Sequence, residues 1–97
     1  MSSFDVGETI ICSVEVTDAA GDYADPATSM NIEIYLVSPY TVVVSSTAMS
    51  KDSTGHYHYD FQSASKVTGD YRAKYIATDG TRITIETEDF KLSIGGD

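Results

Sequence analysis

Apolar and polar residues alternate along most of this chain, and turn residues separate the alternating segments. Such alternation is typical of β-strands that bury one face. The two clearest segments each follow a Gly-x-Tyr unit, Gly55-His56-Tyr57 in one case and Gly69-Asp70-Tyr71 in the other. We predict that these two strands fold over a shared core and that the remaining segments pack onto them.

Several short segments are predicted to be strands, and none shows sustained helical periodicity. These predicted strands are 4–8, 9–17, 30–37, 41–50, 56–61, 71–77 and 82–94. The side chains expected to face the core are Ile10, Cys12, Val14, Val16, Met30, Ile32, Ile34, Leu36, Tyr57, Tyr59, Phe61, Tyr71, Ala73, Tyr75 and Ala77, followed in the last strand by Ile83, Ile85, Phe90, Leu92 and Ile94.

Two of these segments depart from simple alternation. The run Val42-Val43-Val44 has no phase, so 41–50 is predicted to be an edge strand or a strand with a bulge. In 82–94 the apolar residues change from odd-numbered to even-numbered positions at Glu88-Asp89. A bulge there would allow both groups of apolar residues to face the core. Asp79-Gly80 gives the strongest hairpin signal, because both central residues of a type I′ turn have positive φ.

About seven short strands separated by turns predict an all-β fold, an antiparallel β-sandwich with immunoglobulin-like topology. The whole chain, 1–97, is expected to be a single domain with short flexible ends at 1–3 and 95–97. Tyr71, just inside the penultimate strand, suits the tyrosine-corner role, in which its hydroxyl bonds back to the preceding connection. The Cys…Trp…Cys framework of antibody domains is absent, because the chain has one Cys and no Trp.

The charge balance is strongly acidic, with 6 basic and 15 acidic residues and a net charge of −9. The basic residues are scattered singly, which argues against binding to nucleic acid. Solubility is the simplest reason for the acidity, while partners with basic surfaces or a high-salt setting remain open. Cys12 has no partner for a disulfide within the chain, and its place on an apolar strand face predicts a small buried hydrophobe.

The N-terminal residues show neither the basic nor the apolar region of a signal peptide, and no apolar run is long enough to span a membrane. A starting Met followed directly by an edge segment favours a complete small protein. No nucleophile elbow and no glycine-rich phosphate loop is present in the sequence, so we expect neither enzymatic activity nor a cofactor.

One group of residues resembles a metal site. His56, His58 and Asp60 alternate along one strand, which places them on one face, where imidazoles can share a metal ion. An ordinary solvated face is the favoured interpretation, because structural zinc sites usually need four protein ligands. The alternative is a site at a symmetry axis, where several copies pool these ligands.

Aspartates crowd the first long connection, at Asp18, Asp22 and Asp25. Their spacing lacks the alternation and the closing Glu of a calcium-binding loop. Side-chain bonding to the backbone of the turns is the commoner role of such residues, and it is the role that we predict.

Several stretches resemble a family of small immunoglobulin-like proteins found in the virion gene clusters of tailed phages. They are F-D-V-G-E-T-I, D-A-A-G-D-Y-A-D-P-A-T, the S-P after the second strong strand, D-S-T-G-H-Y-H-Y-D, T-G-D-Y-R-A-K-Y and a closing E-x-x-x-F-x-L. The likeness extends from about Phe4 to Leu92. Tyr71 stands where the family often has Trp, and Tyr40 stands where it often has Gly. The resemblance implies a structural module of a virion, as a decoration, neck or tail component.

The leading hypothesis is therefore a non-enzymatic structural protein of a phage-like virion, assembled in the host cytoplasm. Its partners would be capsid, neck or tail proteins, with self-association left open, and an edge strand and a loop end would make the contacts. The residues expected to take part in contacts are Phe4, Tyr23, Tyr40, Val42, Val43 and Val44. The alternative is an adhesion or carbohydrate-binding module of a larger exported protein, with Tyr23, Tyr35 and Tyr40 as a stacking platform.

Overall fold

Eight β-strands form from the alternating segments in the computed structural model, which describes residues 2–94. The strands are β1 (Ser2–Asp5), β2 (Thr9–Glu15), β3 (Ser29–Leu36), β4 (Thr41–Ala48), β5 (Ser50–Ser53), β6 (His56–Gln62), β7 (Gly69–Asp79) and β8 (Arg82–Ser93). Of the ends predicted to be flexible, residues 1 and 95–97 lie outside the described part, whereas Ser2 and Ser3 belong to β1.

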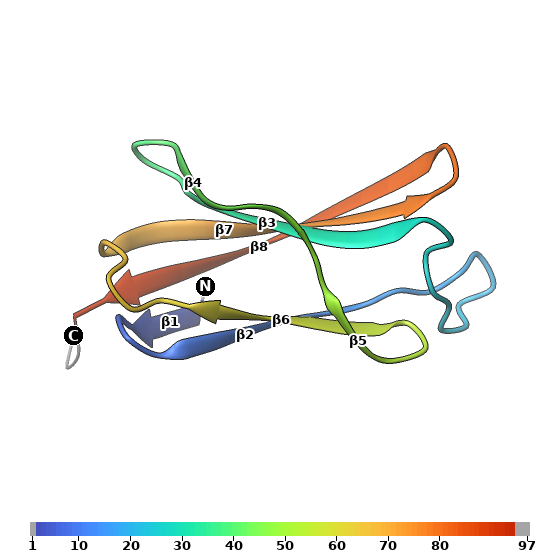
Figure 1. Cartoon of the computed structure of the whole chain (residues 1–97), viewed down its shortest axis with the longest axis horizontal. Coiled ribbons are helices and arrows are strands. Elements are labelled where there is room, and N and C mark those ends of the chain that lie inside the picture. Colours follow the sequence, from blue (N-terminus) through green and yellow to red (C-terminus); the bar gives the residue numbers. More distant parts are fainter. Residues whose placement is uncertain (1, 95–97) are drawn as a thin grey trace.

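Two sheets face each other and form an elongated sandwich of 43 × 23 × 19 Å (Figure 1). One sheet has the strand order β1-β8-β7-β3-β4, and the other has the order β2-β6-β5. Most neighbouring strands are antiparallel, while β1 pairs with β8 in parallel. This order corresponds to the two sheets of an immunoglobulin-like domain. The predicted all-β sandwich is confirmed.

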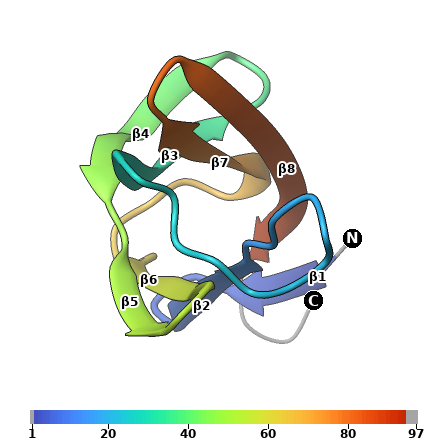
Figure 2. The same cartoon turned by 90° about the vertical axis from the view of Figure 1, so that its right-hand side faces the viewer.

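The predicted strand 41–50 is divided between the two sheets. β4 ends at Ala48, and after the buried Met49 the chain continues as β5 in the opposite sheet (Figure 2). β4 is an edge strand, as predicted, and its register with β3 shifts at two places. Because of these shifts, the consecutive residues Val43 and Val44 both pack against the core. The irregular register explains why apolar and polar residues do not alternate in this stretch of sequence.

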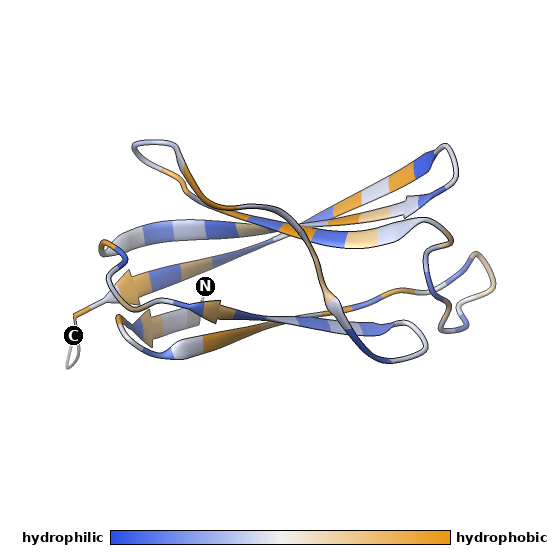
Figure 3. Ribbon diagram, in the orientation of Figure 1, coloured by the Kyte–Doolittle hydropathy of each residue, from blue (hydrophilic) through white to orange (hydrophobic). Residues whose placement is uncertain are grey.

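Hydrophobic and hydrophilic residues alternate along the strands (Figure 3). The apolar side chains of the core lie between the inner faces of the sheets. The buried hydrophobic residues are Ile10, Cys12, Met30, Ile32, Ile34, Leu36, Met49, Tyr57, Phe61, Tyr71, Ala73, Tyr75, Phe90 and Leu92. All of them except Met49 were predicted from the alternation. Burial raises the pKa of the Cys12 thiol to about 11, so the thiol stays protonated at neutral pH, as a buried hydrophobe should.

Tyr71 occupies the tyrosine corner that the sequence predicts. Its hydroxyl donates a hydrogen bond of 2.6 Å to the backbone oxygen of Val67, in the connection before β7. The fully buried ring stacks on Phe90 of β8, with ring centroids 5.6 Å apart. The corner therefore fastens the β6–β7 connection to the aromatic part of the core.

The prediction for the first half of β8 is wrong. The register between β7 and β8 runs without a shift from Asp79↔Arg82 to Gly69↔Leu92, so no bulge occurs at Glu88-Asp89. Since Phe90 and Leu92 face the core, the odd-numbered residues of the strand face outward. Ile83 and Ile85 are consequently 60% and 52% exposed.

The shape of the sandwich explains this error. The β7–β8 hairpin extends beyond the three-stranded sheet (Figure 1), so no opposite sheet covers its inner face there. Polar residues on that face remain in water, and the apolar ones need not point inward. Ile94, also predicted to be inward, follows the end of β8 and is exposed.

The turn between β7 and β8 confirms the hairpin but corrects its type. Asp79 pairs with Arg82, so the two central residues are Gly80 and Thr81. Gly80 has φ of +66°, whereas Thr81 is not among the residues with positive φ. A positive φ at the first central position alone is the pattern of a type II′ turn rather than type I′.

Replacing Tyr71 by Phe tests the tyrosine corner. The substitution keeps the ring and removes only the hydroxyl that bonds to Val67, so we expect the free energy of unfolding to fall by about 1 kcal/mol. Urea unfolding followed by circular dichroism measures this change. The matched control is Tyr40→Phe, at a side chain that is 64% exposed, where the change should stay within about 0.5 kcal/mol. Equal effects of the two substitutions would contradict the assigned role.

Candidate functional site

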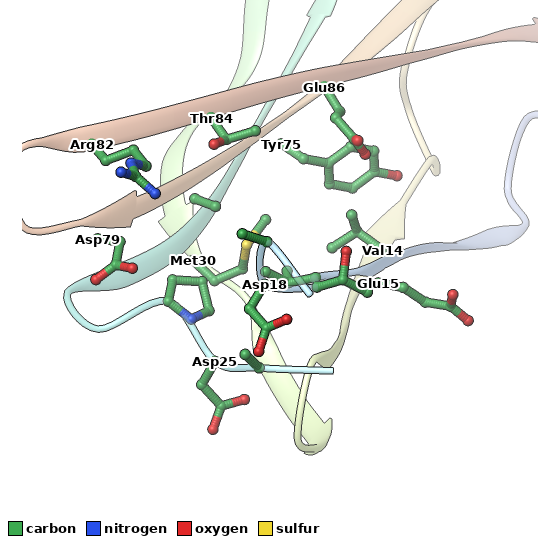
Figure 4. A pocket seen from close by; sticks show the side chains of 16 residues that line it. Val14, Glu15, Asp18, Asp25, Met30, Tyr75, Asp79, Arg82, Thr84 and Glu86 are labelled. Atoms are coloured by element: carbon green, nitrogen blue, oxygen red, sulfur yellow. The ribbon is translucent and has the colours of Figure 1, made fainter. Parts of the chain in front are cut away.

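An open cleft lies where the β7–β8 hairpin extends past the smaller sheet, between this hairpin and the end of β2 (Figure 4). Its volume is about 400 Å³. Val14, Met30 and Tyr75 form an apolar floor. The charged residues that line it are the acidic Glu15, Asp18, Asp25, Asp79 and Glu86 and the basic Arg82. This charge pattern favours ligands that carry positive charge.

The aspartates beside the cleft already bond to the backbone or to a neighbouring side chain. Oδ1 of Asp18 accepts hydrogen bonds from the amides of Ala20 and Asp22, at 2.9 and 3.1 Å. Asp25 accepts hydrogen bonds from Nζ of Lys51 at 2.6 Å and from the amide of Gly55 at 2.9 Å. The Lys51 ammonium and the Gly55 amide lower the pKa of Asp25. Both aspartates thus bond to backbone amides of turns, which is the role that the sequence predicts.

His56 and His58 have separate contacts. Nδ1 of His58 lies 2.7 Å from Oδ1 of Asp52, and its Nε2 lies 3.9 Å from Oδ1 of Asp60. Nδ1 of His56 lies 3.9 Å from Oε1 of Glu15, and the His56 ring packs on Tyr23 with centroids 4.3 Å apart. Among residues 2–94, no group of three or more His, Cys, Asp or Glu side chains is arranged to hold a metal ion.

The residues predicted to make contacts occupy different parts of the sandwich. On edge strand β4, Val42 is 40% exposed, whereas Val43 and Val44 are half-buried against the core. Phe4 of β1 is half-buried and meets the ring of Phe90 edge to face, with centroids 6.1 Å apart. Val42 is therefore the most exposed of these four apolar side chains.

The three tyrosines proposed as one sugar-stacking platform are divided between the two ends of the molecule. Tyr35 and Tyr40 form a tilted pair at the β3–β4 turn, with ring centroids 5.0 Å apart. Tyr23 lies in the connection between β2 and β3, at the opposite end of the sandwich (Figure 1). The surface available for stacking is therefore the Tyr35–Tyr40 pair next to Val42.

The sequence reasoning missed the outer face of the β7–β8 hairpin. Ile83 and Ile85 lie there, and Ile76 of β7 pairs with Ile85 in the register. The available signal was the uninterrupted alternation from Arg82 to Thr87, which needs no bulge if the isoleucines point outward.

Comparison of the chain with protein-family models, with curated proteins and with solved structures found no match. In the part of the chain that the structure describes, there is no helix of the length and hydropathy needed to cross a membrane.

Gly55, from the first Gly-x-Tyr unit, joins three segments at the cleft end of the sandwich. Its carbonyl accepts a hydrogen bond from the amide of Val16 at 2.7 Å, and its amide donates to Asp25. With φ of +77°, a Cβ added here would lie 2.6 Å from the backbone oxygen of Val16 and 2.9 Å from Cβ of Tyr23. Neither the conformation nor the space suits another residue.

Gly55→Ala should therefore destabilise the protein more than Gly80→Ala does. Both positions have positive φ, but a Cβ at Gly80 meets nothing within 4 Å. The two substitutions share the backbone penalty of about 1 kcal/mol, and only Gly55→Ala adds a clash, worth about 1–3 kcal/mol. Thermal and urea unfolding of both variants measure the difference. If the two lose the same stability, the close packing around Gly55 is wrong.

Proposed function

We propose that this protein is a non-enzymatic structural module of a tailed-phage-like particle, which attaches to a capsid, neck or tail protein through one edge of its sandwich. The observation that carries the attachment surface is the cluster at the β3–β4 end, in which Tyr40 and Val42 are exposed and Tyr35 is half-buried beside them. Aromatic side chains are enriched in the buried centres of protein interfaces, because they offer a large contact area at low conformational cost. The particle itself is inferred from the resemblance of the sequence motifs.

The surface around this cluster supports protein binding rather than further strand addition. The register shifts in β4 bend the edge, and such bulges disfavour the pairing of another strand. Side chains would then supply the contact, with Tyr40 and Val42 at its centre. The net charge of −9 favours a partner with a neutral or basic surface.

Analysis of purified particles tests this proposal. Mass spectrometry should detect the chain in intact particles, and Val42→Lys should reduce its incorporation severalfold, because a charge would be placed in a buried apolar contact. The control is Ile11→Lys, at an exposed aliphatic residue of the other sheet (66% against 40% for Val42), which should leave incorporation unchanged. Particles that lack the chain altogether would refute the proposal.

The Tyr35–Tyr40 pair also supports a second candidate function, which is carbohydrate binding by an adhesion module. Exposed aromatic rings stack on the apolar faces of sugars, and Tyr40 of this pair is 64% exposed. The ring planes are inclined by 46°, so they would hold two sugar units at an angle rather than one flat ring.

A glycan array followed by titration tests this second candidate. Tyr40→Ala should abolish any binding, whereas Tyr23→Ala, at the opposite end of the sandwich, should leave it intact. An array without hits would exclude carbohydrate binding by this pair and would leave the particle proposal unaffected.

A further inference from the structure

The first half of β8 is an unpaired sheet edge. β7 pairs with β8 along its whole length, but β1 pairs with it only from Phe90 to Ser93. Within residues 2–94, no strand lies beside the stretch from Arg82 to Asp89 on the side away from β7 (Figure 2). In contrast to β4, this stretch has no shift in register. It is a regular edge without a bulge, which another strand can join.

The orientation of the backbone groups follows from one hydrogen bond. The carbonyl of Ser93 accepts a bond from the amide of Val6, on the β1 side of the strand. Backbone groups alternate between the two sides of a strand, and β8 has no bulge, so Ile83, Ile85 and Thr87 direct their N–H and C=O groups to this same free side.

The sequence along this edge is complementary to its own reverse. Residues 81–87 read T-R-I-T-I-E-T, so that Arg82 and Glu86 lie at equal distances on either side of Thr84, as do Ile83 and Ile85. If two such strands run antiparallel about a two-fold axis at Thr84, Arg82 of each copy faces Glu86 of the other. Ile83 of each copy likewise faces Ile85 of the other.

We propose that two copies of this chain associate through these edges, in an antiparallel two-fold pairing of β8 centred on Thr84. The two five-stranded sheets would join into one continuous sheet. Directly opposed side chains in such a pair have Cβ atoms about 5 Å apart, close enough for both the charge pairs and the isoleucine pairs to interact.

The neighbouring registers fit less well. Only residues whose backbone groups face the free edge can bond to each other, and these are the odd-numbered residues. The two-fold axis can therefore pass through a different residue only if odd-numbered residues of one copy remain opposite odd-numbered residues of the other. A centre at Ile85 places Arg82 opposite Glu88, but it keeps only one isoleucine pair and leaves Glu86 opposite Thr84. A centre at Ile83 places Arg82 opposite Thr84. The register centred on Thr84 alone matches the charges at Arg82 and Glu86 and both isoleucine pairs.

The same pairing accounts for side chains that the single chain leaves unused. Ile83 and Ile85 are exposed, and none of the ion pairs among residues 2–94 includes Arg82 or Glu86. Each finds a partner in the second copy. The pairing from Arg82 to Glu86 also ends before Phe90, where β1 begins to occupy the edge.

Charge reversal at Arg82 and Glu86 provides the test. In Arg82→Glu, glutamates oppose each other at both ends of the pairing, and in Glu86→Arg, arginines do. Each variant alone should dimerise about tenfold more weakly than the wild type. An equimolar mixture of the two variants restores opposite charges at both ends and should form a heterodimer. The double variant Arg82→Glu/Glu86→Arg should dimerise like the wild type.

Analytical ultracentrifugation over a range of protein concentrations measures all five samples, and circular dichroism verifies that each variant is folded. The matched control is Lys91→Glu, on the stretch of β8 that β1 covers, which should dimerise as the wild type does. A wild-type protein that stays monomeric, or a mixture that associates no better than the separate variants, would overturn the proposal. This experiment uses the isolated protein, so its outcome is independent of any place in a particle.

Discussion

The packing of three aromatic rings across the sandwich is the interaction on which the rest of the structure depends. Phe61 belongs to the smaller sheet, and its ring contacts both Tyr71 and Phe90 of the larger sheet, with centroids 6.3 and 6.0 Å apart. Aromatic pairs contribute about 0.5–1.5 kcal/mol each beyond the area that they bury. Since the chain has no disulfide among its described residues, this cluster and the hydrogen bond of Tyr71 hold the two sheets in their relative position.

That position leaves part of the larger sheet uncovered. The aromatic cluster lies near the Phe90 end of β8, whereas the opposite end of the β7–β8 hairpin extends beyond the strands of the smaller sheet. The acidic cleft follows from this feature, because the uncovered part of the hairpin forms one of its walls. The edge of β8 is free along the same part for a different reason, since β1 pairs only with Phe90–Ser93.

The two long edges of the larger sheet differ in how they can bind. β4 has an irregular register and presents Val42 beside a pair of tyrosines, so its contacts would be made by side chains. β8 has a regular register, and its free backbone groups can pair with another strand. One edge is therefore suited to a different protein and the other to a second copy of this chain, so the two proposals do not compete for the same surface.

The sequence by itself determined the strands, nearly all of the core and the tyrosine corner. The alternation in Met30–Leu36 and Tyr71–Tyr75 defines two faces, and in each segment only one face is apolar. The order of the sheets, the passage of the chain between them at Met49 and the outward position of Ile83 and Ile85 required the tertiary structure. The physical reason is that alternation separates two faces of a strand, whereas the extent of the opposite sheet decides whether a face is covered. In β8 the apolar face of the strand is also the face that packs on the core only in the part of the strand that lies opposite the smaller sheet.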